Sequence, residues 1–112
     1  MKAILLNPST QTVTEVNHDN TLDSIYNHLD CRTFTTFAMS HEKMGCSKNF
    51  AYCDDEGLLQ SGIVSATKFK GYSSPIVGNV LFVGDAFGES RDTTLSVDEV
   101  KDMVESYGLL DL

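Results

Sequence analysis

The sequence predicts a single small α+β domain over residues 1–112, with a mostly antiparallel sheet and two helices. A chain of 112 residues has the usual length of one domain. Hydrophobic residues make up 41% of it and charged residues 21%, a balance that supports a core and is unlike that of a disordered chain. Segments rich in β-branched residues alternate with two segments of helical periodicity, which gives the order β-β-α-β-β-loop-β-α.

The first two strands are predicted to form an antiparallel hairpin. Residues 2–6 are apolar on both faces, as expected of an internal strand. Residues 7–10 read Asn-Pro-Ser-Thr, which favours a type I turn because Pro fits its second position. Residues 12–16 are rich in β-branched side chains and complete the hairpin.

A helix is predicted over residues 21–29. Its apolar stripe has the spacing i, i+3, i+4, i+7 and consists of Leu22, Ile25, Tyr26 and Leu29. Asn20 is the expected N-cap, and Asp23 lies in the first turn, where the helix dipole favours negative charge.

The middle of the chain returns to strand-forming residues. Strands are predicted over residues 32–39 and 50–54, with Phe50 and Tyr52 on one face and Ala51 and Cys53 on the other. Residues 40–49 read as a loop. Residues 54–57 read as a turn, in which Asp side chains cap backbone amides and stay solvated.

The second half carries weaker signals until its end. Residues 58–75 have little pattern, with brief pairing expected at residues 63–64. Residues 76–83 form an apolar strand in which Gly78 suggests a bulge, and residues 84–94 read as a polar loop.

A second helix is predicted to follow. Ser96 and Glu99 make a capping box, and Gly108 is a suitable residue just after the helix. Its apolar positions are Val97, Val100, Val104 and Tyr107.

Charge is distributed unevenly along a chain of net charge −8. Residues 1–56 carry a net charge of −4, residues 57–84 a net charge of +2 with no acid, and residues 85–112 a net charge of −6. This balance disfavours direct binding to nucleic acid or to an anionic membrane, since both bind through Lys and Arg. Three cysteines and a start without a secretory signal lead us to expect a cytoplasmic protein with reduced thiols.

Catalytic and metal-binding signatures are weak. His41, Cys46, Cys53 and Asp54 lack the close Cys-x-x-Cys or His-x₃-His spacing of zinc sites. Cys46 has lysines nearby but no local signature of a nucleophile. Residues 84–88 lack the Gly-Lys-Ser/Thr ending of a phosphate loop. We expect no catalytic residue, no metal and no cofactor.

The acid-free segment 65–75 is the predicted ligand-binding site. It combines lysines and hydroxyls, which suit phosphate, with aromatic rings, which suit stacking. The predicted ligand-binding residues are Thr67, Lys68, Phe69, Lys70, Tyr72, Ser73 and Ser74. The alternative is a surface loop in which Phe69 and Tyr72 pack into the core while the lysines reach solvent.

Four blocks of the sequence resemble a family carried by phages and other mobile elements. They are residues 1–8, 22–29, 54–59 and 75–84, and the resemblance covers roughly residues 1–105. The family is described only as a domain of unknown function, DUF3846. This chain departs from it at residues 64–67, where family members carry an arginine before Ala-Thr. The resemblance implies a small phage accessory protein in a bacterial host cytoplasm.

These observations lead to several functional hypotheses. The first is a non-catalytic phage or mobile-element protein that binds a host or defence component, or sequesters a phosphorylated, nucleotide-like signalling ligand. The second is an acidic inhibitor or DNA mimic that uses residues 85–105 against a host nucleic-acid-binding protein. The third is a small hydrolase, which would need a buried carboxylate or an activated cysteine. We also expect a homo-oligomer, with a ligand pocket at the subunit boundary.

Overall fold

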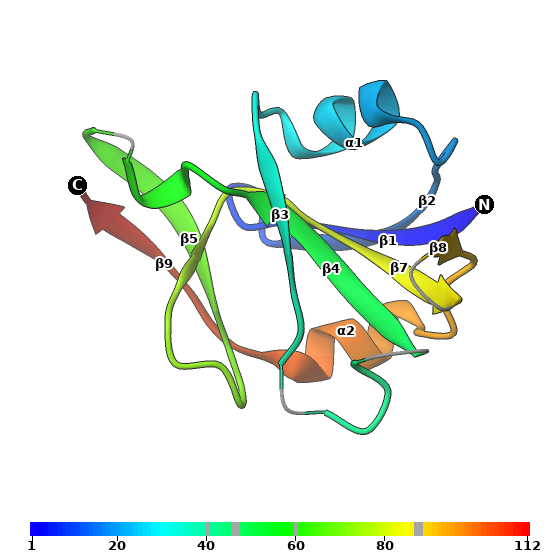
Figure 1. Ribbon diagram of the computed structural model, residues 1–112. Coiled ribbons are helices and arrows are strands. Elements are labelled where there is room, and N and C mark those ends of the chain that lie inside the picture. The colour runs from blue at the N-terminus through cyan, green and yellow to red at the C-terminus, as the bar shows by residue number, and fades with distance from the viewer. Residues whose placement is uncertain (40, 46–47, 60, 87–88) are drawn as a thin grey trace.

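The protein is an α+β domain with antiparallel strands and two helices, as predicted, and its strands form two sheets (Figure 1). This computed structural model describes residues 1–39, 41–45, 48–59, 61–86 and 89–112. The elements are β1 (Lys2–Asn7), β2 (Thr12–Asn17), α1 (Leu22–Leu29), β3 (Phe34–Phe37), β4 (Asn49–Asp54), the 3₁₀ turn η1 (Gly57–Leu59), β5 (Ile63–Phe69), β6 (Ile76–Val77), β7 (Val80–Ala86), β8 (Glu89–Arg91), α2 (Val97–Met103) and β9 (Val104–Asp111). Within the described residues, neither helix has the length and apolar character needed to cross a membrane.

The larger sheet has the strand order β2-β1-β7-β4-β3, and β8 pairs with the end of β7. The predicted β1–β2 hairpin is confirmed, with Leu6 opposite Val13. β1 lies between β2 and β7, and both of its faces are apolar because Ile4 and Leu6 pack in one cluster while Ala3 and Leu5 pack in the other.

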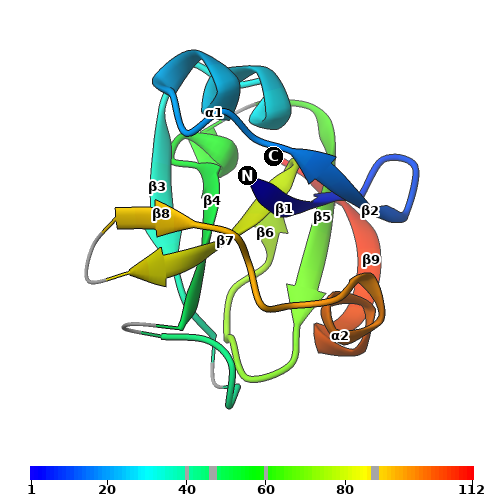
Figure 2. The same cartoon turned by 90° about the vertical axis from the view of Figure 1, so that its right-hand side faces the viewer.

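Two apolar clusters cover the two faces of the larger sheet. As predicted, Ala51 and Cys53 of β4 face one cluster, whereas Phe50 and Tyr52 face the other. The helix α1 covers the sheet face on which Tyr52 lies. The helix α2 and the smaller sheet cover the opposite face, so the main core lies between the two sheets. Figure 2 shows the two helices at opposite ends of the molecule.

The smaller sheet has the order β6-β5-β9, and β9 corrects the prediction for the last helix. The capping box of Ser96 and Glu99 is confirmed, but α2 ends at Met103. Residues 104–111 instead pair with β5. A register shift skips Glu105, so that Val104 and Tyr107, three residues apart, both pack against the core. Pairing with a strand distant in sequence therefore overrides a helix-like spacing.

Four other local predictions are corrected. Gly78 has φ of +82° and separates β6 from β7, so residues 76–83 form two strands in two sheets. Residues 63–69 form a full strand, and β7 and β8 occupy much of the predicted loop 84–94. The N-cap of α1 is Thr21, whose Oγ1 accepts a hydrogen bond from Ser24 N at 3.1 Å.

Candidate functional site

Side chains alternate between the two faces of β5, so the predicted ligand-binding residues on this strand do not all point the same way. Thr67 and Phe69 point into the protein and are 0% and 1% exposed, so neither offers a surface to a ligand. Lys68 and Lys70 are exposed on the other side. Lys68 Nζ lies 3.3 Å from Glu105 Oε2 of β9. The segment that lacks acids in sequence thus has an acid beside it in space.

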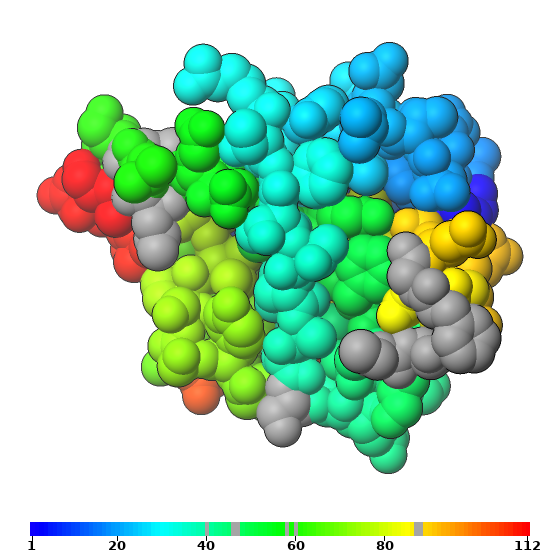
Figure 3. Space-filling view, viewed as in Figure 1, coloured from blue at the N-terminus to red at the C-terminus, as the bar shows by residue number. Residues whose placement is uncertain are grey.

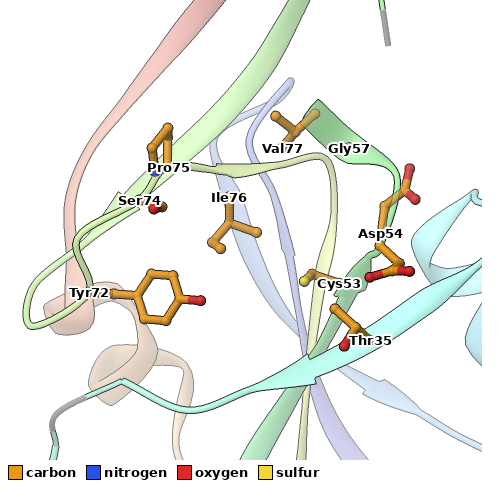
Figure 4. Close-up of a pocket in the computed structure, with 10 residues that line it drawn as sticks. Thr35, Cys53, Asp54, Gly57, Tyr72, Ser74, Pro75, Ile76 and Val77 are labelled. Carbon is orange, nitrogen blue, oxygen red and sulfur yellow. The ribbon is translucent and has the colours of Figure 1, made fainter. Parts of the chain in front are cut away.

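The end of the predicted segment reaches a pocket of about 250 Å³ between the two sheets (Figure 4). Tyr72 and Ser74 line it, whereas the exposed Ser73 does not. The described residues that line it are Thr35, Cys53, Asp54, Asp55, Gly57, Tyr72, Ser74, Pro75, Ile76 and Val77. Figure 3 shows the surface of residues 72–77 (yellow-green) beside that of β3 (cyan). We refer to this cavity as the intersheet pocket.

Aromatic packing positions Tyr72 at the intersheet pocket. Its ring centroid lies 5.2 Å from that of Phe37, which in turn lies 5.9 Å from that of Phe69. Phe69 is anchored in the main core. The Tyr72 hydroxyl consequently points toward the middle of the pocket, toward Thr35 and Ile76 (Figure 4).

The turn after β4 supplies the acidic wall of the pocket. Asp54 Oδ1 accepts a hydrogen bond from Glu56 N at 2.9 Å, which confirms that an Asp caps this turn. Gly57 then lies directly against Val77, because a Cβ at this position would be only 2.9 Å from the Val77 Cβ. The absence of a side chain lets η1 approach β6 and close one side of the pocket.

The intersheet pocket is acidic and rich in hydroxyl groups. Its acidic lining residues are Asp54 and Asp55, and its hydroxyl-bearing lining residues are Thr35, Tyr72 and Ser74. None of the described residues that line it is Lys or Arg. Two further pockets, of about 380 and 400 Å³, also include Asp54 in their walls, and Asp30 lines both of them.

The thiol in this pocket is poorly suited to nucleophilic chemistry. Burial, followed by the charges of Asp54 and Asp55, raises the pKa of Cys53 to about 11. The thiol is therefore protonated near neutral pH, whereas nucleophilic attack and metal binding require the thiolate. Cys46 lies outside the described residues. Among those that are described, His, Cys, Asp and Glu side chains do not gather into a metal-binding group of three.

The acidic segment 85–105 is partly engaged within the chain. Glu99 Oε2 lies 2.6 Å from Lys43 Nζ, and Asp92 Oδ1 accepts a hydrogen bond from Lys2 N at 2.9 Å. Gly84 lies in β7, where a Cβ would come within 2.3 Å of the Asp92 carbonyl oxygen. This glycine is accordingly needed for close packing of the chain.

Sequence reasoning missed the half of the pocket that comes from β3, β4 and η1. Thr35 and Asp55 carried no signal of their own in the sequence. The family resemblance could have pointed to this wall, because two of the blocks that carry it, residues 54–59 and 75–84, contribute residues to the pocket lining.

Comparison with known proteins gives a family and no described activity. The family model described as Domain of unknown function (DUF3846) matches residues 1–108. Neither a curated protein nor a solved structure matches the chain.

Proposed function

The chain belongs to the DUF3846 family, and from its geometry we propose that it is a non-catalytic binding protein whose ligand occupies the intersheet pocket. The observation that carries the proposal is the lining: two acidic residues and three hydroxyl-bearing residues line the cavity together with apolar residues. Ligand pockets commonly combine an apolar surface with a few convergent polar groups.

The lining favours a ligand rich in hydrogen-bond donors, neutral or positively charged. A carboxylate accepts hydrogen bonds and has no proton to donate when ionised. Asp54 and Asp55 would repel a phosphate group placed in the pocket, and the chain as a whole has a net charge of −8. If the ligand is nucleotide-like, its sugar and base should therefore enter the pocket, and any phosphate should remain in solvent.

Calorimetric titration with guanosine, guanosine monophosphate and guanosine triphosphate tests this ligand class. The three compounds share the guanine base and the 2′- and 3′-hydroxyls, and they differ in the negative charge at the 5′ position. We expect affinity to fall from guanosine to the triphosphate, and putrescine serves as a cationic probe. Absence of binding by guanosine and putrescine, or tightest binding by the triphosphate, would contradict the proposed ligand class.

Two substitutions locate the binding site. Tyr72→Phe removes the hydroxyl and keeps the ring that packs on Phe37, so guanosine affinity should fall about three- to tenfold, as expected for one lost hydrogen bond. Asp55→Asn should weaken binding by about tenfold, because charge-assisted bonds are stronger. Asp102→Asn makes the same charge change on α2, outside the pocket lining, and should leave affinity unchanged.

The biological setting that we propose is a phage or mobile element acting in a bacterial host cytoplasm, where sequestering a signalling ligand would counter a defence response. It rests on the resemblance of residues 1–8, 22–29, 54–59 and 75–84 to a family carried by phages and other mobile elements. Inhibition of a host protein by the acidic segment 85–105 is the second candidate, favoured by the exposed side chains of Asp98 and Asp102. Binding through that surface should weaken steeply with salt, whereas guanosine binding should change little.

A further inference from the structure

Exposed apolar side chains gather at one end of the smaller sheet. The exposed large hydrophobic residues there are Leu59 at 81%, Ile63 at 72%, Leu109 at 70% and Leu112 at 40%. Ile63 lies opposite Asp111 and Ser65 lies opposite Leu109, so Ile63 and Leu109 share one face of the β5–β9 ribbon. Clustered exposure of this kind marks interaction surfaces more often than isolated exposure does.

The outer edge of β9 can accept another strand. In the described chain β9 pairs only with β5, and Figure 1 shows it on the outside of the smaller sheet. Gly62 and Leu112 exchange both backbone hydrogen bonds, at 3.0 and 2.8 Å. Because bonded and non-bonded pairs alternate in antiparallel strands, residues 110, 108 and 106 bond to β5 in the same way. Tyr107, Leu109 and Asp111 therefore direct their backbone N–H and C=O groups to the open edge.

The open edge lacks two of the usual protections against pairing, Lys and Pro. Edge strands of monomeric proteins commonly carry Lys or Pro. β9 has neither, and its sequence is Val-Glu-Ser-Tyr-Gly-Leu-Leu-Asp. Asp111 is the only charged side chain in residues 61–67 and 106–112. A second copy can approach this end of the ribbon with little repulsion despite the net charge of the whole chain.

We infer that two copies of this chain associate through antiparallel pairing of their β9 edges, which joins the smaller sheets into one six-stranded sheet across a twofold axis. A strand edge requires a strand as its partner, and a second copy supplies the same edge together with the same apolar residues.

The acidic residues of β9 select the register. Centring the axis on Gly108 would place Glu105 opposite Asp111 of the other copy, and like charges directly opposite each other are unfavourable. Centring it on Leu109 places the two Leu109 side chains together at the axis and Asp111 opposite Tyr107. All three outward-facing residues are paired in this second register.

Sedimentation velocity over a concentration series tests the association. We expect the wild-type protein to form a dimer with a micromolar dissociation constant, since one strand edge makes an interface at the small end of the specific range. Leu109→Pro removes an outward N–H and leaves the bonds to β5 intact. It should raise the dissociation constant at least about tenfold, and so should Leu109→Ser.

Leu22→Ser is the matched control, because Leu22 is 61% exposed on α1, away from the ribbon. It should dimerise like the wild-type protein. A wild-type protein that stays monomeric at high micromolar concentration would overturn the inference, and so would Leu109 variants that dimerise normally. If Leu109→Pro fails to fold, the comparison of Leu109→Ser with Leu22→Ser decides.

Amide hydrogen exchange adds a position-specific readout. The amides of Tyr107, Leu109 and Asp111 should become protected as the protein concentration rises, whereas those of Gly108 and Leu110 should be protected at every concentration. Equal behaviour of odd- and even-numbered residues would rule out pairing at this edge.

Discussion

Substitution of Gly57 by alanine tests how η1 closes the intersheet pocket. A Cβ at residue 57 would lie 2.9 Å from the Val77 Cβ, while ordinary contacts begin at 3.4 Å, so η1 and β6 must separate by about half an ångström. Such overpacking costs about 1–3 kcal/mol, and the lower chain entropy of alanine in the unfolded state returns about 0.4–1 kcal/mol. We expect a net loss of about 1–2 kcal/mol in unfolding free energy.

Urea denaturation measures that loss of unfolding free energy. Guanosine titration measures the effect on the intersheet pocket, and the affinity for guanosine should fall because η1 moves away from Val77. The matched control is Gly108→Ala, because a Cβ at Gly108 would meet no atom within 4 Å. This control should be more stable than the wild-type protein by about 0.4–1 kcal/mol, because it keeps the entropy gain of alanine without the overpacking. A Gly57→Ala protein with wild-type stability and affinity would refute the argument that this glycine is needed for close packing.

Three further predictions concern single buried groups. Asn49 is fully buried and makes four hydrogen bonds through its side chain, so Asn49→Leu should lower the unfolding free energy by about 2–4 kcal/mol in urea denaturation. Burial lowers the pKa of His18, and the charge of His28 lowers it further. The unfolded state therefore binds more protons than the folded state as the pH falls below the ordinary histidine pKa of about 6.5. Stability should therefore fall as pH decreases through that range, and His18→Asn should show a shallower decrease. The third prediction uses a variant in which serine replaces Cys31 and Cys46, so that Cys53 is the remaining thiol. At pH 8 the folded protein should react with iodoacetamide about a hundredfold more slowly than the urea-unfolded protein, because burial raises the pKa of Cys53 to about 11. Equal reaction rates would contradict the burial of Cys53.

Local chemistry was enough to predict the elements that depend on neighbouring residues. The helix α1, the β1–β2 hairpin and the capping box of α2 each follow from residues within one or two turns of chain. The two faces of β4 followed from strict alternation.

Long-range pairing explains what the sequence did not reveal. Residues 104–107 have a spacing compatible with a helix, and only the contact with β5 makes them a strand. Of the predicted ligand-binding residues, Tyr72 and Ser74 line the intersheet pocket. Had residues 63–69 been identified as a strand, its alternation would have indicated that Thr67 and Phe69 face the core. The remaining wall comes from β3, β4 and η1, segments brought to residues 72–77 only by the fold.

Chemical-shift mapping with guanosine is the most direct test of a donor-binding pocket between the sheets. In ¹⁵N–¹H spectra the perturbed amides should cluster on Thr35, Asp55, Tyr72 and Ser74, and Tyr72→Phe should diminish those shifts. Perturbations confined to α2 and β8, or a spectrum that guanosine leaves unchanged, would contradict the account.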